Sequence, residues 1–330
     1  MSTLAPNSLD ELTEAVRAHA KLLPRGAGTK SALCSHPKYT PLDMRGLSGI
    51  VEYLPQEYTI TMRAGTSLTE VKEALAEYGQ YLPFDPPLGA AGATIGGTVA
   101  AGLSGPGRIR YGGVRDFILG VTLVTGTGQV VHGGGKVVKN AAGFDLPKFF
   151  VGSQGRFGVL AEMTFKVFPH APAYHTWEAP PSALGKLLRG TQPCDAIEYD
   201  PTAELLHIRT GSHEPRPPIA SATPGNRDIW KELANFEWAD TNLLIKVPIT
   251  PKDISRISDL PGIHWIGQGG QVLWVSGCDH NTLHKALTGL GLQGLALWNS
   301  TGPCWLGKIN TSPYEQRLKH LFDPEARFPS

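Results

Sequence analysis

The sequence predicts an α+β protein built from two modules, and three observations support this fold class. Helical patterns with capping signals alternate with short apolar runs of strand type. Glycine supplies 39 of the 330 residues, well above average usage, so the chain makes many turns. A proline-rich stretch, 169–181, separates a first part with glycine-rich loops from a second part in which helices alternate with paired strands.

The first module is expected to open with a helix over about 9–20, because Ser8 and Glu11 have the spacing of a capping box. Ser67 and Glu70 repeat this signal and predict a second helix that Gly79 ends. Short apolar or alternating runs predict strands in five further segments, which are KLLPRGAGTK (21–30), GIVEYLP (49–55), TITMRAG (59–65), FILGVTLVTGTGQVVHGGG (117–135) and VLAEMTFKVF (159–168).

The second module shows helical patterns near 182–189 and 281–289, and after Asn226 and Pro251. Strand patterns lie between them, in AIEYD, LLHIRTG, LLIKV, HWIG, QVLWVSG and LALWN. This alternation predicts a small ferredoxin-like α+β cap with helices on one face of an antiparallel sheet. We therefore expect a first domain over 1–170, with subdomains of about 1–50 and 51–170, a cap over 171–309, and a segment 310–330 that returns to the first domain.

Composition excludes several functional classes. A net charge of +1 supplies no field for nucleic acid, and the four cysteines form no CxxC pair for zinc or an iron–sulfur cluster. The first residues carry no secretory signal pattern, so we expect a cytoplasmic protein. The uncharged stretch 86–107 is too poor in large aliphatic residues for a membrane span and too apolar for a linker. It predicts a packed loop whose backbone approaches a ligand.

Two glycine clusters, PRGAGTK (24–30) and GATIGGTVAAG (92–102), are the strongest candidates for a binding site. Neither matches the GxGxxG fingerprint or the P-loop, which disfavours both site types. Glycine permits positive φ and brings no Cβ, so successive amides of both clusters can converge on a diphosphate. Thr29 adds a hydroxyl group and Lys30 a charge. On composition alone, turns that serve only the fold remain an alternative.

A longer run of motifs carries a resemblance. PRGAGTK, FDPP, GATIGGTVAAG, RYGGVRDFILGVTLVTGTGQVV and VVKNAAGFDLPKFFVGSQGRFGVLAEMTFKVFP follow one another in order over about residues 5–170. They resemble the two-subdomain FAD-binding domain of the vanillyl-alcohol oxidase / p-cresol methylhydroxylase (PCMH) superfamily. The blocks KNAAGFDLPKFFVGSQGRFGVL and LFDPEARF further resemble the FAD-binding subunits of bacterial and cyanobacterial glycolate oxidase.

The resemblance implies a set of FAD contacts. It places Arg25, Gly26, Ala27, Gly28, Thr29 and Lys30 around the diphosphate, mostly through backbone amides. It places Pro86, Thr94, Ile95, Gly96 and Gly97 along the diphosphate and flavin, with Ala100 to Gly102 closing the loop and Gly158, Val159 and Leu160 along the cofactor. Some relatives bind the flavin covalently through a histidine of the first loop, which here has none, so noncovalent FAD is expected.

The departures from the family concern function. Hydroxyacid dehydrogenases of the superfamily carry a histidine-rich, GDGN-containing metal site, which this chain lacks, and its tail reads ARFPS where FNPGR is usual. The resemblance therefore implies a subunit whose FAD carries electrons between a catalytic flavoprotein and an iron–sulfur subunit, with membrane contact only through these partners. Two alternatives stay open: an autonomous FAD-dependent D-lactate or glycolate dehydrogenase, and a non-catalytic flavin-binding scaffold.

Several other residues were weighed. An autonomous dehydrogenase would need a cationic clamp for its substrate, for which Arg209, Arg216 or Lys246 is available. No general base is assigned. His280 and His284 have metal-ligand spacing, but a solvated helix face is the favoured interpretation. A flavin-adjacent or subunit-facing loop is one interpretation of Lys139, Asn140, Phe144 and Asp145, and for Asp145 a helix cap is favoured. We expect the glycine loop to be braced, or the cofactor to be reached, by Arg110, Tyr111, Arg115 and Asp116.

Overall fold

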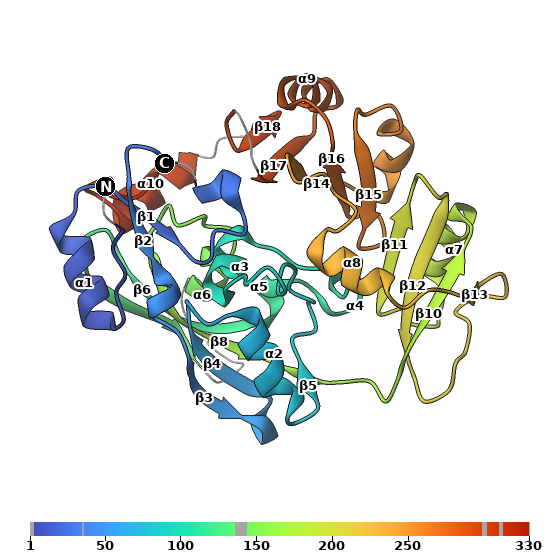
Figure 1. Cartoon of the computed structure of the whole chain (residues 1–330), viewed down its shortest axis with the longest axis horizontal. Coiled ribbons are helices and arrows are strands. Elements are labelled where there is room, and N and C mark those ends of the chain that lie inside the picture. Colours follow the sequence, from blue (N-terminus) through green and yellow to red (C-terminus); the bar gives the residue numbers. More distant parts are fainter. Residues whose placement is uncertain (1–2, 35, 136–143, 299–301, 310–312, 330) are drawn as a thin grey trace.

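The computed structural model describes residues 3–34, 36–135, 144–298, 302–309 and 313–329. Figure 1 shows two parts side by side, and the chain passes from the first to the second between β9 and β10. The last helix, α10 (Pro313–Phe322), lies back on the first part, close to the N-terminus. The described residues include no helix with the length and apolar character of a bilayer span.

The first elements form a small unit that delivers the first glycine cluster. Helix α1 (Leu9–Ala18) starts where Ser8 Oγ accepts from Glu11 N at 3.2 Å, as the capping box predicts. Strand β1 (Leu22–Arg25) pairs in parallel with β2 (Thr40–Asp43), and the 3₁₀ helix η1 (Ser31–Cys34) lies between them. Because β1 is paired with β2 along its whole length, the glycine cluster starts from a fixed strand end at Arg25.

A five-stranded antiparallel sheet forms the centre of the first part. Its central strand β8 pairs with β4 and β6, and predicted strands account for all five members. In spatial order they are β3 (Ile50–Leu54), β4 (Thr59–Arg63), β8 (Val159–Lys166), β6 (Ile118–Val124) and β7 (Val130–Gly134). Short 3₁₀ helices η2 (Met44–Gly46) and η3 (Pro55–Glu57) precede β3 and β4, and β5 (Gln80–Tyr81) pairs with β9 (Phe168–Pro169).

Helices pack on this sheet and build the main core. They are α2 (Leu68–Ala76), α3 (Ile95–Ala101), α5 (Val114–Phe117) and α6 (Leu146–Phe150). The short helix α4 (Arg108–Tyr111) instead contacts strand 196–200 of the second part. Helix α3 corrects an expectation, because the second glycine cluster is not an irregular loop. Thr94 Oγ1 caps the helix start by accepting from Gly97 N, and Gly102 ends it with φ +60°, so tertiary packing of Ile95 and Val99 outweighs the low helix propensity of glycine.

The second part contains one nine-stranded sheet, formed from two ferredoxin-like units. Numbering the first four strands of each unit along the chain, both have the spatial order 4-1-3-2, and the ninth strand of the sheet is added at the outer edge of the second unit. In the first unit no helix lies between the third and fourth strands, which departs from the ferredoxin-like pattern. The units meet at their second strands, where Tyr199 of one pairs with Ile266 of the other. In spatial order the strands are β13 (Thr223–Pro224), β10 (Tyr174–Ala179), β12 (Leu205–Gly211), β11 (Ala196–Asp200), β15 (Ile263–Gly267), β16 (Val272–Ser276), β14 (Leu244–Pro248), β17 (Gln293–Trp298) and β18 (Trp305–Gly307).

Helices of the cap follow the predicted positions with two differences. Helices α7 (Leu184–Arg189), α8 (Ile229–Asn235) and α9 (His280–Leu290) are present, with the 3₁₀ helix η4 (Pro181–Ala183) before α7. The segment after Pro251 is the short 3₁₀ helix η5 (Pro251–Arg256), and the proline-rich stretch contains strand β10. Prolines of this stretch flank β10, where their missing N–H groups cost no ladder bond.

The C-terminal residues close onto the first part through one buried carboxylate. Asp323 Oδ1 accepts from Arg327 N at 2.8 Å, and Asp323 Oδ2 accepts from Phe328 N at 2.9 Å. This turn presents Arg327 O to Leu22 N at 2.8 Å and places Phe328 in the core of α1 and β1. The block LFDPEARF therefore packs against strand β1, which carries the first glycine cluster.

Candidate functional site

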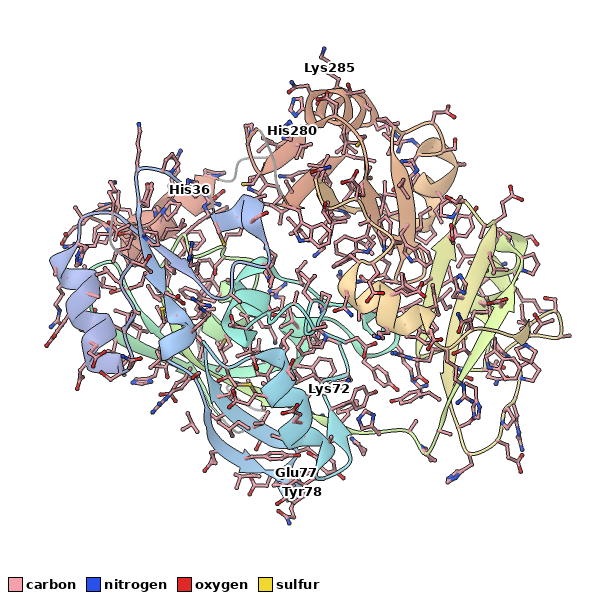
Figure 2. All side chains as sticks on the ribbon, in the orientation of Figure 1. His36, Lys72, Glu77, Tyr78, His280 and Lys285 are labelled. Carbon is pink, nitrogen blue, oxygen red and sulfur yellow. The ribbon has the colours of Figure 1, made fainter. Side chains whose placement is uncertain are left out.

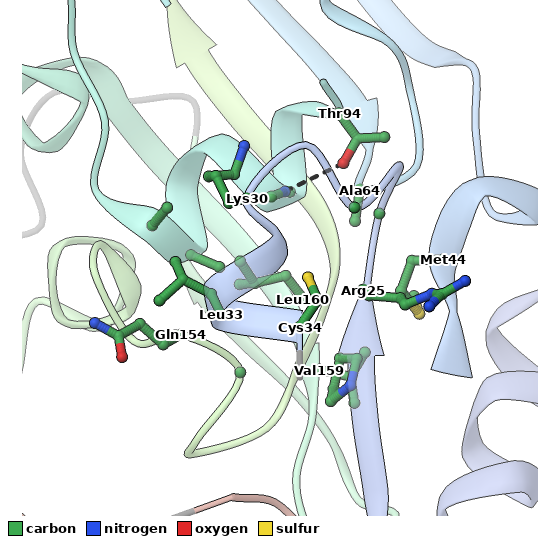
Figure 3. A pocket seen from close by; sticks show the side chains of 18 of the residues that line it. Arg25, Lys30, Leu33, Cys34, Met44, Ala64, Thr94, Gln154, Val159 and Leu160 are labelled. Atoms are coloured by element: carbon green, nitrogen blue, oxygen red, sulfur yellow. Dashed lines mark hydrogen bonds between the residues drawn. The ribbon is translucent and has the colours of Figure 1, made fainter. Parts of the chain in front are cut away.

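The two glycine clusters lie together in the fold, although about 60 residues of chain separate them. They line an open pocket whose space, counted together with the adjoining solvent, is about 740 Å³. Figure 3 shows Arg25 and Met44 on one side of this pocket and Gln154 on the other. Thirteen of the residues named above line it, namely Arg25, Gly26, Ala27, Gly28, Thr29, Lys30, Thr94, Gly96, Gly97, Ala100, Gly158, Val159 and Leu160.

Three of the expected residues do not line the pocket. Ile95 is fully buried in the core beneath α3, because the helix turns that side chain toward the sheet. Gly102 ends α3, where its φ of +60° lets the chain leave the helix. Pro86 lies outside the pocket as well. A helical segment presents only one of its faces to a ligand, so consecutive residues cannot all contact one.

The glycines allow backbone segments to approach closely. A Cβ on Gly96 would lie 2.8 Å from both Cβ and O of Ala64, and a Cβ on Gly26 would collide with Oγ1 of Thr94. Gly97 faces Lys30, whose Nζ would be 4.0 Å from an added Cβ. The first cluster therefore packs directly on the N-terminal turn of α3 because both segments lack side chains at their contact.

The clusters differ in the hydrogen-bond donors that they offer. In the second cluster, Ile95 N donates to Thr66 O at 2.9 Å, Gly96 N donates to Ala64 O at 2.9 Å, and Gly97 N donates to Thr94 Oγ1 at 3.2 Å. These amides are satisfied within the fold, which corrects the expectation that amides of both clusters converge on one diphosphate. Within the described residues, no acceptor is present for the amides of residues 26–30. Free donors therefore come from the first cluster.

Charged and polar side chains add to the donors of the pocket. Lys30 is 6% exposed, and its Nζ donates to Thr29 Oγ1 at 3.0 Å. Burial lowers the pKa of Lys30 to about 8, against a smaller opposing effect of Cys34. Arg25 Nε and Ser153 Oγ are buried and have no hydrogen-bond partner in the part of the chain that the structure describes. The pocket thus presents unpaired donors and positive charge, a set that suits an anion.

Sequence reasoning missed part of the lining. Leu33, Cys34, Met44, Ala64 and the turn 153–155 also face the pocket. The turn is held against α3, because Gln154 N donates to Ala100 O at 2.8 Å and Gly152 N donates to Val99 O at 2.9 Å. The sequence pattern GSQG (152–155), with glycine on both sides of two polar residues, is a signal for such a turn. In the structure Gln154 and Gly155 both have positive φ.

Comparison with curated proteins finds a relative that matches nearly the whole chain. Glycolate oxidase subunit GlcE of Escherichia coli (strain K12) is 33% identical, and the match covers 96% of this chain and 93% of the relative. The chain belongs to the family of glycolate oxidase subunit GlcE. A sequence profile described as "FAD binding domain" matches residues 2–134, the region that holds both glycine clusters.

Other relatives of this GlcE-family chain match mainly by one part. Glycolate oxidase subunit GlcD of Bacillus subtilis (strain 168) is 30% identical over 51% of this chain and 37% of its own length. A D-lactate dehydrogenase of Anaerostipes hadrus is 30% identical over 51% of this chain and 33% of its own length. Among solved structures, an alkyldihydroxyacetonephosphate synthase superposes with a TM-score of 0.71 at 16% identity, covering 98% of this chain and 75% of that chain. The predicted PCMH-type fold is confirmed.

The donor set fits FAD, the cofactor named by the matching profile. A diphosphate needs several amide donors and a cation, which residues 26–30 and Lys30 offer. Buried Arg25 Nε and Ser153 Oγ lack partners, and apolar side chains such as Leu33 and Leu160 offer contact area for aromatic rings. The pocket residues thus match a ligand that combines an anionic centre with apolar ends.

The cations weighed for a substrate carboxylate do not converge in this GlcE-family chain. Arg209 forms an ion pair with Asp85 and lies over the rings of Tyr174 and Trp230. Lys246 Nζ donates to Gly102 O at 3.0 Å, and exposed Arg216 pairs with Glu214 at 3.0 Å. Each cation has a separate partner, so these residues form no shared clamp.

Residues beside the second glycine cluster brace the cap against the first part. Arg110 Nη1 and Tyr111 Oη both donate to Asp195 Oδ1, the latter at 2.6 Å. Asp116 instead closes its own turn, since its Oδ2 accepts from Gly113 N at 2.8 Å. Arg110 and Tyr111 therefore contact the cap and do not line the glycine pocket.

The remaining candidates have structural roles. His280 Nε2 lies 3.0 Å from Pro303 O, and His284 Nδ1 accepts from Gly307 N at 3.1 Å. This face of α9 is therefore packed against the protein, and the expectation of a solvated face was wrong. Figure 2 shows Lys285 pointing away from the cap on the same helix. No group of three metal-ligating side chains occurs among the described residues. Asp145 caps α6 by accepting from Lys148 N at 3.3 Å, as predicted; Lys139 and Asn140 lie outside the described residues.

Proposed function

We propose that this chain binds FAD noncovalently in the glycine pocket and acts as the FAD-binding subunit of a glycolate oxidase complex. The observation that carries the proposal is the pocket where the two glycine clusters meet, with buried donors that lack partners in the described part of the chain. Membership in the GlcE family supports the oxidoreductase class and the kind of complex. When bound, FAD supplies two-electron reduction and reoxidation of its flavin ring.

The residues divide into three roles in this proposal. The amides of residues 26–30 and the Lys30 ammonium group hold the diphosphate, and Arg25 and Ser153 donate to further polar atoms of the cofactor. Gly26, Gly96 and Gly97 permit the close backbone approach. Residues 158–160 and Leu33 supply apolar contact area. Ile95 acts from the core by placing α3 and has no cofactor contact.

The proposal makes the chain an electron carrier and not the site of substrate oxidation. Arg209, Lys246 and Arg216, the cations available for a hydroxyacid, each have another partner. Electrons from glycolate then reach this subunit from a catalytic flavoprotein partner and leave to an iron–sulfur partner. The chain works in the cytoplasm and meets a membrane only through these subunits.

We propose a division of the chain into domains that follows the five-stranded and the nine-stranded sheet. Residues 1–170 form the FAD-binding domain, with subdomains of about 1–50 and 51–170, and residues 171–309 form the cap. Residues 310–330 return to the first domain. The hydrogen bonds from Asp323 and from Arg327 O to strand β1 support this last assignment.

Flavin absorbance of the purified chain, with and without partners, tests the proposed function. The chain is expected to carry flavin that acid releases, which indicates noncovalent attachment. Glycolate or D-lactate is expected to bleach this flavin only when the catalytic flavoprotein subunit is present. Bleaching of the isolated chain by either substrate would instead show an autonomous dehydrogenase. Protein that takes up no flavin on incubation with FAD would contradict the proposal altogether.

A further inference from the structure

The cap holds backbone carbonyl groups of both glycine clusters from outside the pocket. Trp298 Nε1, at the end of β17, donates to Thr29 O at 2.9 Å. Lys246 Nζ, on β14, donates to Gly102 O at 3.0 Å. Gln268 Nε2, which follows β15, donates to Ser104 O at 2.8 Å. Three donors of one sheet therefore engage the two segments that form the pocket, and the Trp298 bond lies within the first glycine cluster itself.

The indole ring of Trp298 is held in place by its own neighbours. Phe236 meets it edge to face, with ring centroids 5.9 Å apart and an interplanar angle of 87°. Strand β17 continues from the core of the cap, where Leu297 is fully buried and Leu244 pairs with Trp298. A donor fixed in this way loses little conformational entropy when it forms its hydrogen bond. The contact can therefore impose an orientation on the loop that it touches.

The bond from Trp298 sets the orientation of one peptide plane. In a trans peptide the C=O of residue 29 and the N–H of residue 30 lie in one plane and point in opposite directions. When Thr29 O turns toward Trp298, outside the pocket, the Lys30 amide N–H must point the other way. Lys30 N is one of the amides that lack an acceptor among the described residues. A rotation of this plane would replace a donor at the pocket with a carbonyl oxygen.

Such a rotation changes ψ of Thr29 and φ of Lys30, directly after Gly28. Gly28 has a φ of +74° with no atom within 4 Å of an added Cβ, so this part of the loop is not packed against other residues. An anion site depends on amides that already point at the anion before it arrives. The Lys30 side chain does not supply this restraint, because the hydrogen bond of its Nζ among the described residues goes to Thr29 Oγ1 and to no backbone atom of the loop.

We infer that Trp298 of the cap is a positioning residue for the cofactor, because its indole N–H holds the Thr29–Lys30 peptide with the amide toward the diphosphate site. The inference rests on the proposed FAD site. It makes the affinity for FAD a property of the whole chain and not of the FAD-binding domain alone. It assigns a function to the cap that does not involve substrate.

The test compares Trp298→Phe with Trp230→Phe in the full chain. Phe at 298 keeps an aromatic ring beside Phe236 and removes the N–H donor together with part of the ring volume, a loss of volume that Trp230→Phe shares. Trp230 Nε1 donates to Thr176 Oγ1 at 2.9 Å inside the cap, so Trp230→Phe removes a bond of the same type away from the loop. Dissociation constants are measured for FAD, for ADP, which keeps the diphosphate, and for riboflavin, which lacks it. Melting temperatures of the ligand-free proteins accompany each measurement.

Trp298→Phe is expected to raise the dissociation constants of FAD and ADP by a similar factor of about five, which corresponds to one hydrogen bond of about 1 kcal/mol. Riboflavin binding and the behaviour of Trp230→Phe should stay at the wild-type level. Amide exchange at Lys30 should become faster in the FAD-bound Trp298→Phe protein. Equal weakening of riboflavin, or unchanged ADP binding, would overturn the role of Trp298. Wild-type protein that binds neither FAD nor ADP would instead refute the proposed function.

Discussion

Thr94 occupies the space that a side chain on Gly26 would need. A Cβ added to Gly26 would collide with Thr94 Oγ1 and lie 3.1 Å from Thr94 Cγ2. Thr94 cannot rotate away without loss, since its Oγ1 accepts from Gly97 N and caps α3. This contact connects the two glycine clusters, and it makes the geometry of the pocket sensitive to a single methyl group.

Gly26→Ala is expected to weaken FAD binding by at least about fivefold, because the loop must shift or α3 must lose a cap of about 1 kcal/mol. Equilibrium titration with FAD measures the effect. Gly89→Ala is the matched control, since its added Cβ would meet only Leu68 Cβ at an ordinary 3.7 Å. Equal affinities of Gly26→Ala and wild type would show that the contact between the clusters does not shape the site.

Lys30→Met is expected to have opposite effects on binding and on stability. Removing the ammonium group should weaken FAD by about tenfold at pH 7, the value of a charge-assisted hydrogen bond. The ligand-free variant should be more stable than wild type at pH 7, because burial lowers the pKa of Lys30 to about 8 and so disfavours its charged form in the fold. Calorimetry of both forms measures the two effects. A variant that loses both binding and stability would contradict this role.

The pH dependence of FAD binding provides a separate test of Lys30. The diphosphate prefers the protonated lysine, so the dissociation constant should be flat below about pH 8 and rise above it, by up to about tenfold per unit. Lys30→Met should show no such rise. Ligand-free wild type should gain stability as the pH rises from 8 toward 10.5, because the unfolded chain then binds more protons at this site. Parallel slopes for wild type and variant would assign the effect to another group.

Asp85→Asn should destabilise the contact between the cap and the first domain by about 3 kcal/mol. Asp85 pairs with Arg209, and Arg209 Nε is already buried without a partner, so the substitution leaves a charge in the interface. Asn should keep the bond that Gly107 N donates to Asp85 Oδ2 at 2.9 Å. The free energies of urea unfolding of wild type, Asp85→Asn, Arg209→Met and the double variant form a double-mutant cycle that measures the coupling between the two side chains. Additive losses would show that the pair is not coupled.

Glu198 should make the stability fall as the pH rises from about 4.5 to 7. Its carboxylate is 3% exposed and accepts from Trp265 Nε1 at 2.9 Å and from Gln268 N at 2.8 Å. Burial outweighs these bonds and raises the pKa of Glu198 to about 7, so the folded chain binds the extra proton in this window. Between pH 4.5 and 7 the free energy of unfolding should fall by about 1–3 kcal/mol more in wild type than in Glu198→Gln, as measured by thermal unfolding at several pH values. Identical pH profiles would refute the assignment.

Strong local signals predicted much of the secondary structure. The capping boxes at Ser8 and Ser67 placed the starts of α1 and α2, because a hydroxyl three residues before a free amide satisfies it without any tertiary contact. Short apolar or alternating runs placed all five strands of the first large sheet and six strands of the cap sheet, whereas β10, β13 and β18 were not predicted. Ten of the thirteen expected residues that line the pocket belong to the two glycine clusters, since the absence of side chains can be seen directly in the sequence, and residues 158–160 were placed by the family resemblance.

The sequence by itself determined the order of helices and strands and the two backbone segments without side chains. Tertiary structure alone decided that residues 95–101 form a helix, that the amides of Ile95, Gly96 and Gly97 are already satisfied, and that Arg25 Nε and Ser153 Oγ remain unpaired. It also brought Trp298 to Thr29, across 269 residues of chain. The physical reason is that propensity and capping act between neighbours in sequence, whereas the partner of a buried polar group is whichever atom the packed fold places beside it.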